Sequence, residues 1–266
     1  MAPLVKHDRL HDHDQVAVTI WDLLAWEAPE TLPKSTVAWQ RGMLRRAVRY
    51  ADAVVVPSHA IAHRLGEIAK VGNRVRVIAG AAPEGFAVPT DAAGRRADLT
   101  IPEKYVVLVG TLASLEHGFR AAAAAGVDAV VLDAPEGSEP QLAEVASAAG
   151  LPERRAHIRG ALSVEDRSAV LAGASAFVAT SSLGAWPWRA MEAMTLSVPI
   201  VAVDSGVHHD VIAEGGALVS PGELDEALTD AVGTGAKRLS VLAGDRSRAF
   251  SWASSAERVW ALHADL

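Results

Sequence analysis

The chain has 266 residues, half of them hydrophobic, which is enough for two modest domains or one large one. Its formal net charge of −7 and its scattered Lys and Arg residues exclude the clustered basic surface that nucleic acid binding requires. It has no cysteine, which excludes disulfides, thiolate catalysis and Cys-based zinc sites. No apolar run approaches the roughly 20 residues of a membrane span, and the polar N-terminus is unlike a signal peptide, so we expect a cytoplasmic protein.

Short β-branched runs alternate with longer helical patterns along the chain. The expected strands are Val16–Trp21, Ala53–Pro57, Val75–Ile78, Tyr105–Val109, Ala129–Leu132, His157–Ile158, Ala176–Ala179, Pro199–Val203 and Ala217–Val219. The expected helices are Thr36–Tyr50, His59–Ala69, Gly118–Ala125, Pro140–Ala149, Val164–Ala172, Trp188–Leu196, Val207–Glu214, Glu223–Val232 and Ser251–His263. The strands are continuously apolar, which is typical of strands buried on both faces. The pattern therefore predicts an α/β fold with a parallel, doubly wound sheet.

The segment Gly80–Pro102 is rich in Pro and Gly, and it is the best linker candidate in the chain. Three expected strands precede it and six follow it. Six strands with their helices form a complete doubly wound unit. Three strands do not, unless something else pairs with the exposed sheet edge.

The stretch from Ser181 to Gly206, SSLGAWPWRAMEAMTLSVPIVAVDSG, contains a Glu-Ala-Met triplet at Glu192 and a strand beginning Val-Pro-Ile-Val. It resembles the signature P-S-x-x-E-G-F-G-x-P-x-x-E-A-M of the retaining, GT-B-fold glycosyltransferases of family 4, also called glycosyl transferases group 1. Ser181 matches the Ser of that signature, and Trp186 falls at its Phe. Further stretches resemble other motifs of the family in the same order: Val18–Asp22, Arg49–Ser58, Val75–Gly80, Tyr105–Leu112, His157–Leu162 and Phe250–Arg258.

The resemblance implies a GT-B architecture with one complete Rossmann-like donor domain and an incomplete N-terminal Rossmann-like half-domain. The expected boundaries are 1–90 for the partial acceptor-side domain, 91–249 for the nucleotide-sugar domain, and 250–266 for a helix that crosses back to the N-terminal part. Family members usually carry roughly 90–100 further N-terminal residues, so this chain is expected to start near the middle of that domain.

The resemblance also implies an activity, namely transfer of a hexose from a nucleotide diphosphate sugar to a saccharide or lipid-linked acceptor, with retention. It implies no cofactor besides the donor substrate and no required metal. By this resemblance, the expected nucleotide-sugar-binding residues are Gly110, Thr111, Arg120, Gly160, Trp186 and Glu192.

Several positions depart from the family pattern. An Arg-Lys pair that stabilises the departing diphosphate is expected at positions 115 and 116, where this chain has Leu115 and Glu116. Loss of such a cation typically costs about 3 kcal/mol or more. The helix start after Gly110 still offers N–H groups to a phosphate. Arg120, one turn further on, is either a substitute cation or, as we favour, a solvated Arg on the helix surface.

The family has two carboxylates eight positions apart, one beside the donor sugar and one on the ribose. Glu192 fits the ribose position, whereas Gly184 stands where the sugar-facing acid is expected. Glu192 is therefore either a nucleotide ligand or a Glu held by its helix start or by an Arg such as Arg189. Trp21 replaces the His of the family's V-T-I-H-D stretch, and an indole cannot exchange a proton. The catalytic residues therefore stay unassigned.

The remaining polar motifs carry less weight. The tail His7–Asp14 holds several His and Asp residues that suit a divalent metal, although such tails are usually solvated. His208-His209-Asp210 is expected at a helix start near the donor site.

Two hypotheses about function stay open, an enzyme with altered donor contacts and an inactive partner subunit. We expect a homo- or hetero-oligomer through Val16–Ile78, or else a tail Met1–Gln15 that caps the sheet edge.

Overall fold

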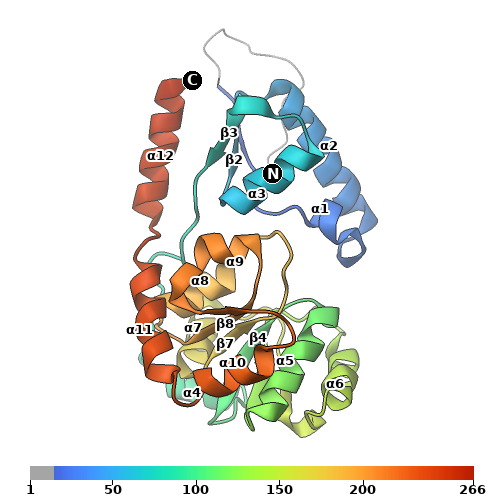
Figure 1. Cartoon of the computed structure of the whole chain (residues 1–266), viewed down its shortest axis with the longest axis vertical. Coiled ribbons are helices and arrows are strands. Elements are labelled where there is room, and N and C mark those ends of the chain that lie inside the picture. The colour runs from blue at the N-terminus through green and yellow to red at the C-terminus, as the bar shows by residue number, and fades with distance from the viewer. Residues whose placement is uncertain (1–14) are drawn as a thin grey trace. The chain divides into compact units, whose positions relative to one another are not determined.

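The computed structural model describes residues 15–266, which divide into two compact units (Figure 1). The first unit comprises the chain through Ala81, the short segment Leu183–Pro187 and the C-terminal segment Phe250–Leu266. The second unit comprises Ala82–Ser182 and Trp188–Ala249. Each unit contains its own parallel sheet, and each is described by itself below.

The second unit is a six-stranded, wholly parallel sheet with helices on both faces (Figure 1). Its strands are β4 Tyr105–Val109, β5 Asp128–Val131, β6 Ala156–Ile158, β7 Phe177–Ala179, β8 Ile200–Val203 and β9 Ala217–Val219. Its helices are α4 Ala92–Asp98, α5 Leu112–Ala124, α6 Glu139–Ala148, η3 Glu153–Arg155, α7 Val164–Gly173, α8 Trp188–Thr195, α9 Gly206–Val211, η4 Ala213–Gly215, α10 Leu224–Ala231 and α11 Ala236–Ser247. The strand order is β6-β5-β4-β7-β8-β9. From β4 the chain adds β5 and β6 on one side and then β7, β8 and β9 on the other, so the order of addition reverses between β4 and β7, as in dinucleotide-binding folds.

The core of the second unit follows from the alternation of side chains along its strands. Val106 and Leu108 of β4 contribute to one apolar cluster with Phe119 of α5 and Leu228 of α10, so these helices cover one face of the sheet. On β4 itself, Tyr105 instead donates its hydroxyl hydrogen to the carbonyl oxygen of Val170 in α7, at 2.6 Å. Both faces of the sheet are therefore buried, which explains the continuously apolar strands.

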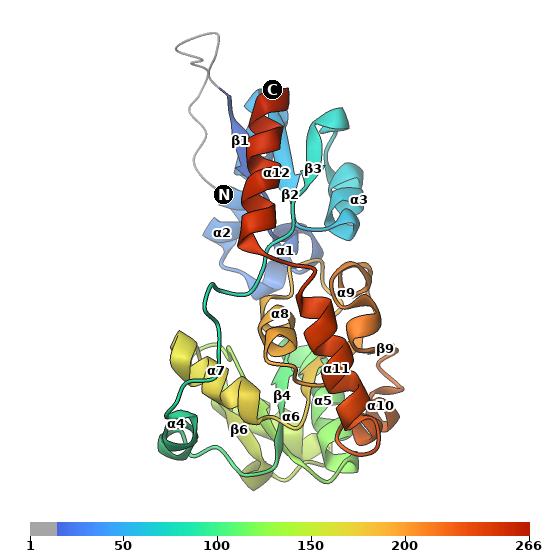
Figure 2. The ribbon, with the colours of Figure 1, turned by 90° about the vertical axis from the view of Figure 1, so that its left-hand side faces the viewer.

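The first unit contains a three-stranded parallel sheet in the order β1-β2-β3. Its elements are β1 Ala17–Thr19, α1 Leu24–Glu27, η1 Pro29–Thr31, α2 Lys34–Tyr50, β2 Ala53–Val56, α3 His59–Ile68, η2 Gly72–Arg74, β3 Val75–Val77 and α12 Trp252–Asp265. Figure 2 shows α12 lying along this sheet. Leu262 of α12 is buried against Ala53, Val55 and Ile78. The C-terminal helix therefore contributes to the core of the first unit.

The segment Leu183–Pro187 is bound to the first unit through its backbone. Ala185 forms an antiparallel bridge with Asp22, and the N–H of Trp186 donates to the carbonyl oxygen of Trp21 at 3.1 Å. The N–H of Gly184 donates to Oε2 of Glu27 at 2.7 Å. A Cβ on residue 184 would lie 2.7 Å from the same Oε2 atom, so the glycine is what allows this close approach.

Several helices begin where the sequence places a hydroxyl residue. Ser58, Ser163, Ser205 and Ser251 each accept a hydrogen bond from the backbone N–H three residues ahead, and Thr111 does the same at the start of α5. Such N-caps satisfy N–H groups that the helix leaves without a partner. These helix starts are therefore set locally by the sequence.

The structure confirms the predicted α/β fold class, and every predicted strand is present within a residue or two of its expected ends. The expected linker Gly80–Pro102 differs, because it contains α4, which packs against α7. Arg95 of α4 pairs with Asp91 in its own helical turn and with Asp166 at the start of α7. Helices α1 and α11 were also not predicted. Helix α1 has only four residues, too few to show a helical period, and α11 mixes apolar and polar residues, so tertiary packing stabilises both.

Candidate functional site

The candidate site in the second unit lies at the point where the strand order reverses. Gly110 and Thr111 follow β4, and Thr180 follows β7, so they meet at the carboxyl ends of adjacent strands. Oγ1 of Thr180 lies 2.9 Å from Oγ of Ser114. Both hydroxyl oxygens occupy the space where a Cβ on Gly110 would lie. Gly110 therefore lets these two hydroxyl groups lie against the backbone, at the position where open α/β sheets bind ligands.

Thr111 caps α5 at this edge. Its Oγ1 accepts from the N–H of Ser114 at 3.2 Å, while the N–H of Thr111 donates to Oγ of Ser114 at 2.9 Å. The reciprocal bonds fix the direction of the first turn of α5. The helix start consequently points a fixed set of backbone groups toward the reversal point.

Glu192 is a buried carboxylate in α8, with 2% of its surface exposed. Its two oxygens accept from Nε and Nη2 of Arg167 at 2.8 and 2.9 Å. Nη1 of Arg189 donates to the same two oxygens at 3.0 and 3.1 Å. Both oxygens of Glu192 thus accept hydrogen bonds from two guanidinium groups. One of the two is Arg189, the residue named above as a structural partner of Glu192; the other, Arg167, was not predicted.

Arg189 extends this cluster to Asp133, which follows β5. Nε and Nη2 of Arg189 donate to the two oxygens of Asp133 at 2.7 and 3.0 Å. Burial opposes the charge of Arg189, but the hydrogen bond to Asp133 and the charge of Glu192 outweigh it and raise its pKa. Arg167, Glu192, Arg189 and Asp133 together carry no net charge. The cluster therefore stabilises itself and does not present a surplus cation to a phosphate.

Four other positions compared with the family pattern lie elsewhere in the second unit. Nε of Arg120 pairs with Asp225 of α10 at 3.1 Å, and its Nη2 donates to the carbonyl oxygen of Pro221 at 3.0 Å, so Arg120 joins α5 to α10. Leu115 is buried in the apolar core, and Glu116 is exposed. Gly160 is exposed just after β6. The roles of Arg120 and Gly160 in nucleotide binding stay predictions.

The remaining expected positions, Trp21, Gly184 and Trp186, belong to the first unit. Trp186 is buried, with its ring edge-on to Phe250 at 6.0 Å between ring centroids. The acid that lies closest to position 184 comes from Glu27, whose Oε1 accepts from Nε of Arg64 at 3.0 Å. Glu27, Arg167 and Asp133 could not be predicted from the sequence, because no local spacing relates them to the residues that they contact.

His208 in α9 is buried, and its Nδ1 lies 2.6 Å from the carbonyl oxygen of Val203. Burial lowers the pKa of His208 below its ordinary value. Nε2 of the adjacent His209 lies 2.6 Å from Asp204. Within residues 15–266, no cluster of three or more His, Asp or Glu side chains is arranged to hold a metal ion. The His-rich stretch His7–Asp14 lies outside the described residues.

None of the helices in the described part of the chain has the length and apolar character needed to cross a bilayer. In the second unit, a functional assignment depends on two features, the ion-pair cluster around Glu192 and the sheet edge at Gly110.

Comparison with solved structures finds the same fold in several proteins, among them a glycosyltransferase from Rickettsia africae. The structure matches HepE from Anabaena in complex with UDP and glucose, with a TM-score of 0.73, 20% identity and coverage of 95% of this chain and 72% of HepE. It matches sucrose-phosphate synthase from Thermosynechococcus elongatus with a TM-score of 0.70, 21% identity and coverage of 94% and 67%. It matches a mutant of TarM from S. aureus with a TM-score of 0.66, 16% identity and coverage of 94% and 50%. At these identities the likeness establishes the fold.

No curated protein matches the sequence. The family described as glycosyl transferases group 1 matches residues 103–236, which span half of the chain and include all of the strands of the second unit. The strand order, the Glu-Ala-Met triplet of α8 and this match agree with one another. The chain belongs to the glycosyl transferases group 1 family.

Proposed function

We propose that this chain binds the diphosphate part of a nucleotide sugar at the carboxyl edge of the sheet in the second unit. The observation that carries the proposal is the place of Gly110, packed against the hydroxyl groups of Thr180 and Ser114, at the reversal between β4 and β7 and beside the capped start of α5. Ligands of open α/β sheets bind at this position, and helix starts favour anions. HepE, which has the same fold, was solved with UDP and with UDP-glucose, which supports UDP as the first nucleotide to test.

The reaction proposed for such a donor is transfer of its hexose to a saccharide or lipid-linked acceptor, with retention. A departing diphosphate gains negative charge, and cations placed beside it stabilise the transition state. Leu115 and Glu116 supply none, and Arg120 is paired with Asp225. Each missing cation removes about 3 kcal/mol of stabilisation, or roughly a hundredfold in rate. We therefore expect turnover by this chain alone to be slow.

The second candidate function is an inactive, donor-binding partner subunit. The neutral cluster of Arg167, Glu192, Arg189 and Asp133 favours it, because the buried cations of this cluster are already paired. The first unit adds a second reason. Trp260 of α12 is 76% exposed, and β1 is an edge strand of the three-stranded sheet. Within the described residues β1 pairs with a strand on one side only, and an edge strand together with an exposed indole favours association through Val16–Ile78 with another chain.

Isothermal titration of the purified chain with UDP, UDP-glucose and UMP tests the binding proposal. We expect UDP and UDP-glucose to bind more tightly than UMP, because UMP lacks the second phosphate. Gly110→Ala should weaken binding, because its methyl group would displace the hydroxyl groups of Thr180 and Ser114 beside the site, whereas Gly94→Ala serves as the matched control because a Cβ at position 94 meets open space. Equal affinity for UMP and UDP, or undiminished binding by Gly110→Ala, contradicts the proposed site.

Release of UDP from UDP-glucose in the presence of simple saccharide acceptors then separates the two candidate functions. Slow, acceptor-dependent release supports a transferase with altered donor contacts. Tight binding without release, together with a dimeric or larger species in light scattering, supports the partner subunit. Absence of nucleotide binding contradicts both.

A further inference from the structure

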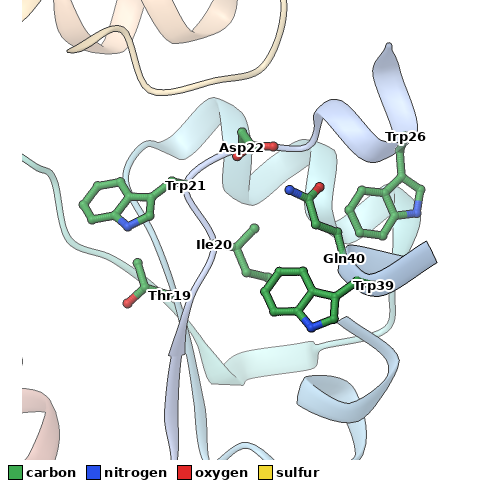
Figure 3. Close-up of a pocket in the computed structure, with 7 residues that line it drawn as sticks. All are labelled: Thr19, Ile20, Trp21, Asp22, Trp26, Trp39 and Gln40. Carbon is green, nitrogen blue, oxygen red and sulfur yellow. The ribbon is translucent and has the colours of Figure 1, made fainter. Parts of the chain in front are cut away.

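The first unit contains a small pocket that the proposed nucleotide site does not use. It opens beyond the carboxyl end of β1 and is bounded by the loop that leads into α1 and by α2 (Figure 3). The lining residues, all of them in the first unit, are Thr19, Ile20, Trp21, Asp22, Trp26, Trp39 and Gln40. The cavity measures about 60 Å³. That volume holds about two water molecules, and it excludes a whole sugar ring or a nucleotide base.

The polar side chains of this pocket include two acceptors. Oε1 of Gln40 is buried and has no hydrogen-bond partner among residues 15–266. Such a buried acceptor is costly, and a donor from a ligand would satisfy it. Asp22 adds a carboxylate, whose Oδ1 accepts from the N–H of Leu24 at 3.1 Å. A carboxylate has room for further hydrogen bonds, so both groups select a ligand that donates.

Indole rings form much of the remaining wall. In Figure 3 the amide of Gln40 lies between the carboxylate of Asp22 and the indole of Trp26, and the indole of Trp39 lies below them. Trp39 is 44% exposed, so one part of its ring is accessible from outside. The face of an indole attracts cations more strongly than the face of any other side chain.

The charge balance of the pocket distinguishes between a neutral and a cationic donor. A neutral hydroxyl would displace water from the half-buried Asp22 and leave its charge without a counter-charge. Arg41, the next residue after Gln40, directs its Nε and Nη2 to the carbonyl oxygen of Ala25 at 3.0 and 2.7 Å and not to Asp22. An ammonium group satisfies the carboxylate, the amide oxygen and the indole faces together.

We propose that this pocket binds an alkylammonium group, with Asp22 and the Oε1 atom of Gln40 as its acceptors and with Trp26 and Trp39 as its aromatic walls. The group enters as the protonated end of a small amine or of an amino sugar. The inference concerns the first unit alone, and it does not depend on nucleotide binding by the second unit.

The test uses the full chain and the indole N–H signals of its NMR spectrum, assigned by single Trp→Phe substitutions. Methylammonium chloride is the minimal probe, methanol is its neutral counterpart, and sodium chloride controls for ionic strength. We expect methylammonium to shift the Trp26 and Trp39 signals saturably, with a Kd on the order of 1 mM, and to leave Trp260 unchanged. Shifts that methanol or sodium chloride reproduces at the same concentration overturn the proposal.

Variants separate the two acceptors from general packing. Asp22→Asn keeps the shape and the bond to Leu24 but removes the charge, and we expect about a tenfold loss of methylammonium affinity. Gln40→Leu removes the buried acceptor and should weaken binding to a similar degree. Trp260→Phe, at a residue that does not line the pocket, is the matched control and should bind normally. If Asp22→Asn loses its native circular dichroism, Gln40→Leu decides the question. Unchanged affinity in a folded variant of either acceptor contradicts the assignment.

Glucosamine and glucose then identify the source of the ammonium group, because they share a ring and differ by one amino group. Saturable shifts with glucosamine and none with glucose extend the site to amino sugars. Binding of methylammonium without glucosamine restricts it to small amines. Binding of glucose as tightly as glucosamine contradicts an ammonium site.

Discussion

Replacement of Glu192 by alanine provides the most direct test of how the candidate site is built. The substitution removes a carboxylate that is 2% exposed and that accepts four hydrogen bonds from Arg167 and Arg189. Arg189 keeps its bonds to Asp133. Arg167 keeps only a bond to the carbonyl oxygen of Leu162 and its position 6.0 Å from the centroid of Phe86, so its buried charge loses its counter-ion.

Removal of one partner of a buried ion pair costs about 3–5 kcal/mol. For a domain of this size, each kcal/mol lowers the melting temperature by about 2–4 °C, so the Glu192→Ala transition should fall by roughly 10 °C. Differential scanning calorimetry measures it. Glu116→Ala, which removes an exposed acid from α5, is the control and should change stability by less than about 0.5 kcal/mol. The double variant Arg167→Met, Glu192→Met should recover part of the loss, because it leaves neither charge unpaired.

The outcome also decides between the two roles considered for Glu192. A ribose ligand should lose roughly 1–3 kcal/mol of nucleotide affinity on substitution, the cost of a lost charged hydrogen bond, at little cost in stability. An unchanged melting temperature together with weakened UDP binding would therefore refute the structural role argued from the arginine contacts.

Three further results are expected. Gly110→Ala should cost about 1–3 kcal/mol of stability by denaturant titration, because the new methyl group overlaps Oγ1 of Thr180; a neutral effect would mean that the site has more room than the contacts indicate. Glu27→Ala should cost about 1–2 kcal/mol, because the N–H of Gly184 loses its acceptor, and proteolysis should then cut Leu183–Pro187 faster; Glu27→Gln, which keeps an acceptor, should resist cleavage. Burial lowers the pKa of His208 below 6.5, so at this residue the unfolded chain binds a proton more readily than the folded chain. The contribution of neutral His208 to the free energy of unfolding is therefore fully present above pH 6.5 and decreases as the pH falls below it. His208→Asn should reduce this pH dependence in melting curves recorded across the range.

Much of the fold was predictable from local features of the sequence. The β-branched runs determine the strands, the Ser and Thr N-caps determine where several helices begin, and the alternation of both patterns determines a parallel α/β sheet. The Glu-Ala-Met triplet at Glu192 indicates the family, because it lies next to a buried strand within the same stretch of chain. These features depend on residues that are neighbours in sequence, so they can be read without the tertiary structure.

The partners of the site residues were decided by the tertiary structure alone. Arg167 reaches Glu192 across 25 positions of sequence, and Gly184 receives its acceptor from Glu27, 157 positions away. Trp26 and Trp39 share a pocket because α1 and α2 pack together beyond β1. The sequence around a charged or aromatic residue does not show which distant residue it will contact. Which groups become neighbours, and which are desolvated as a pair, depends on the path of the chain between them, and that path is determined by the packing of the whole unit.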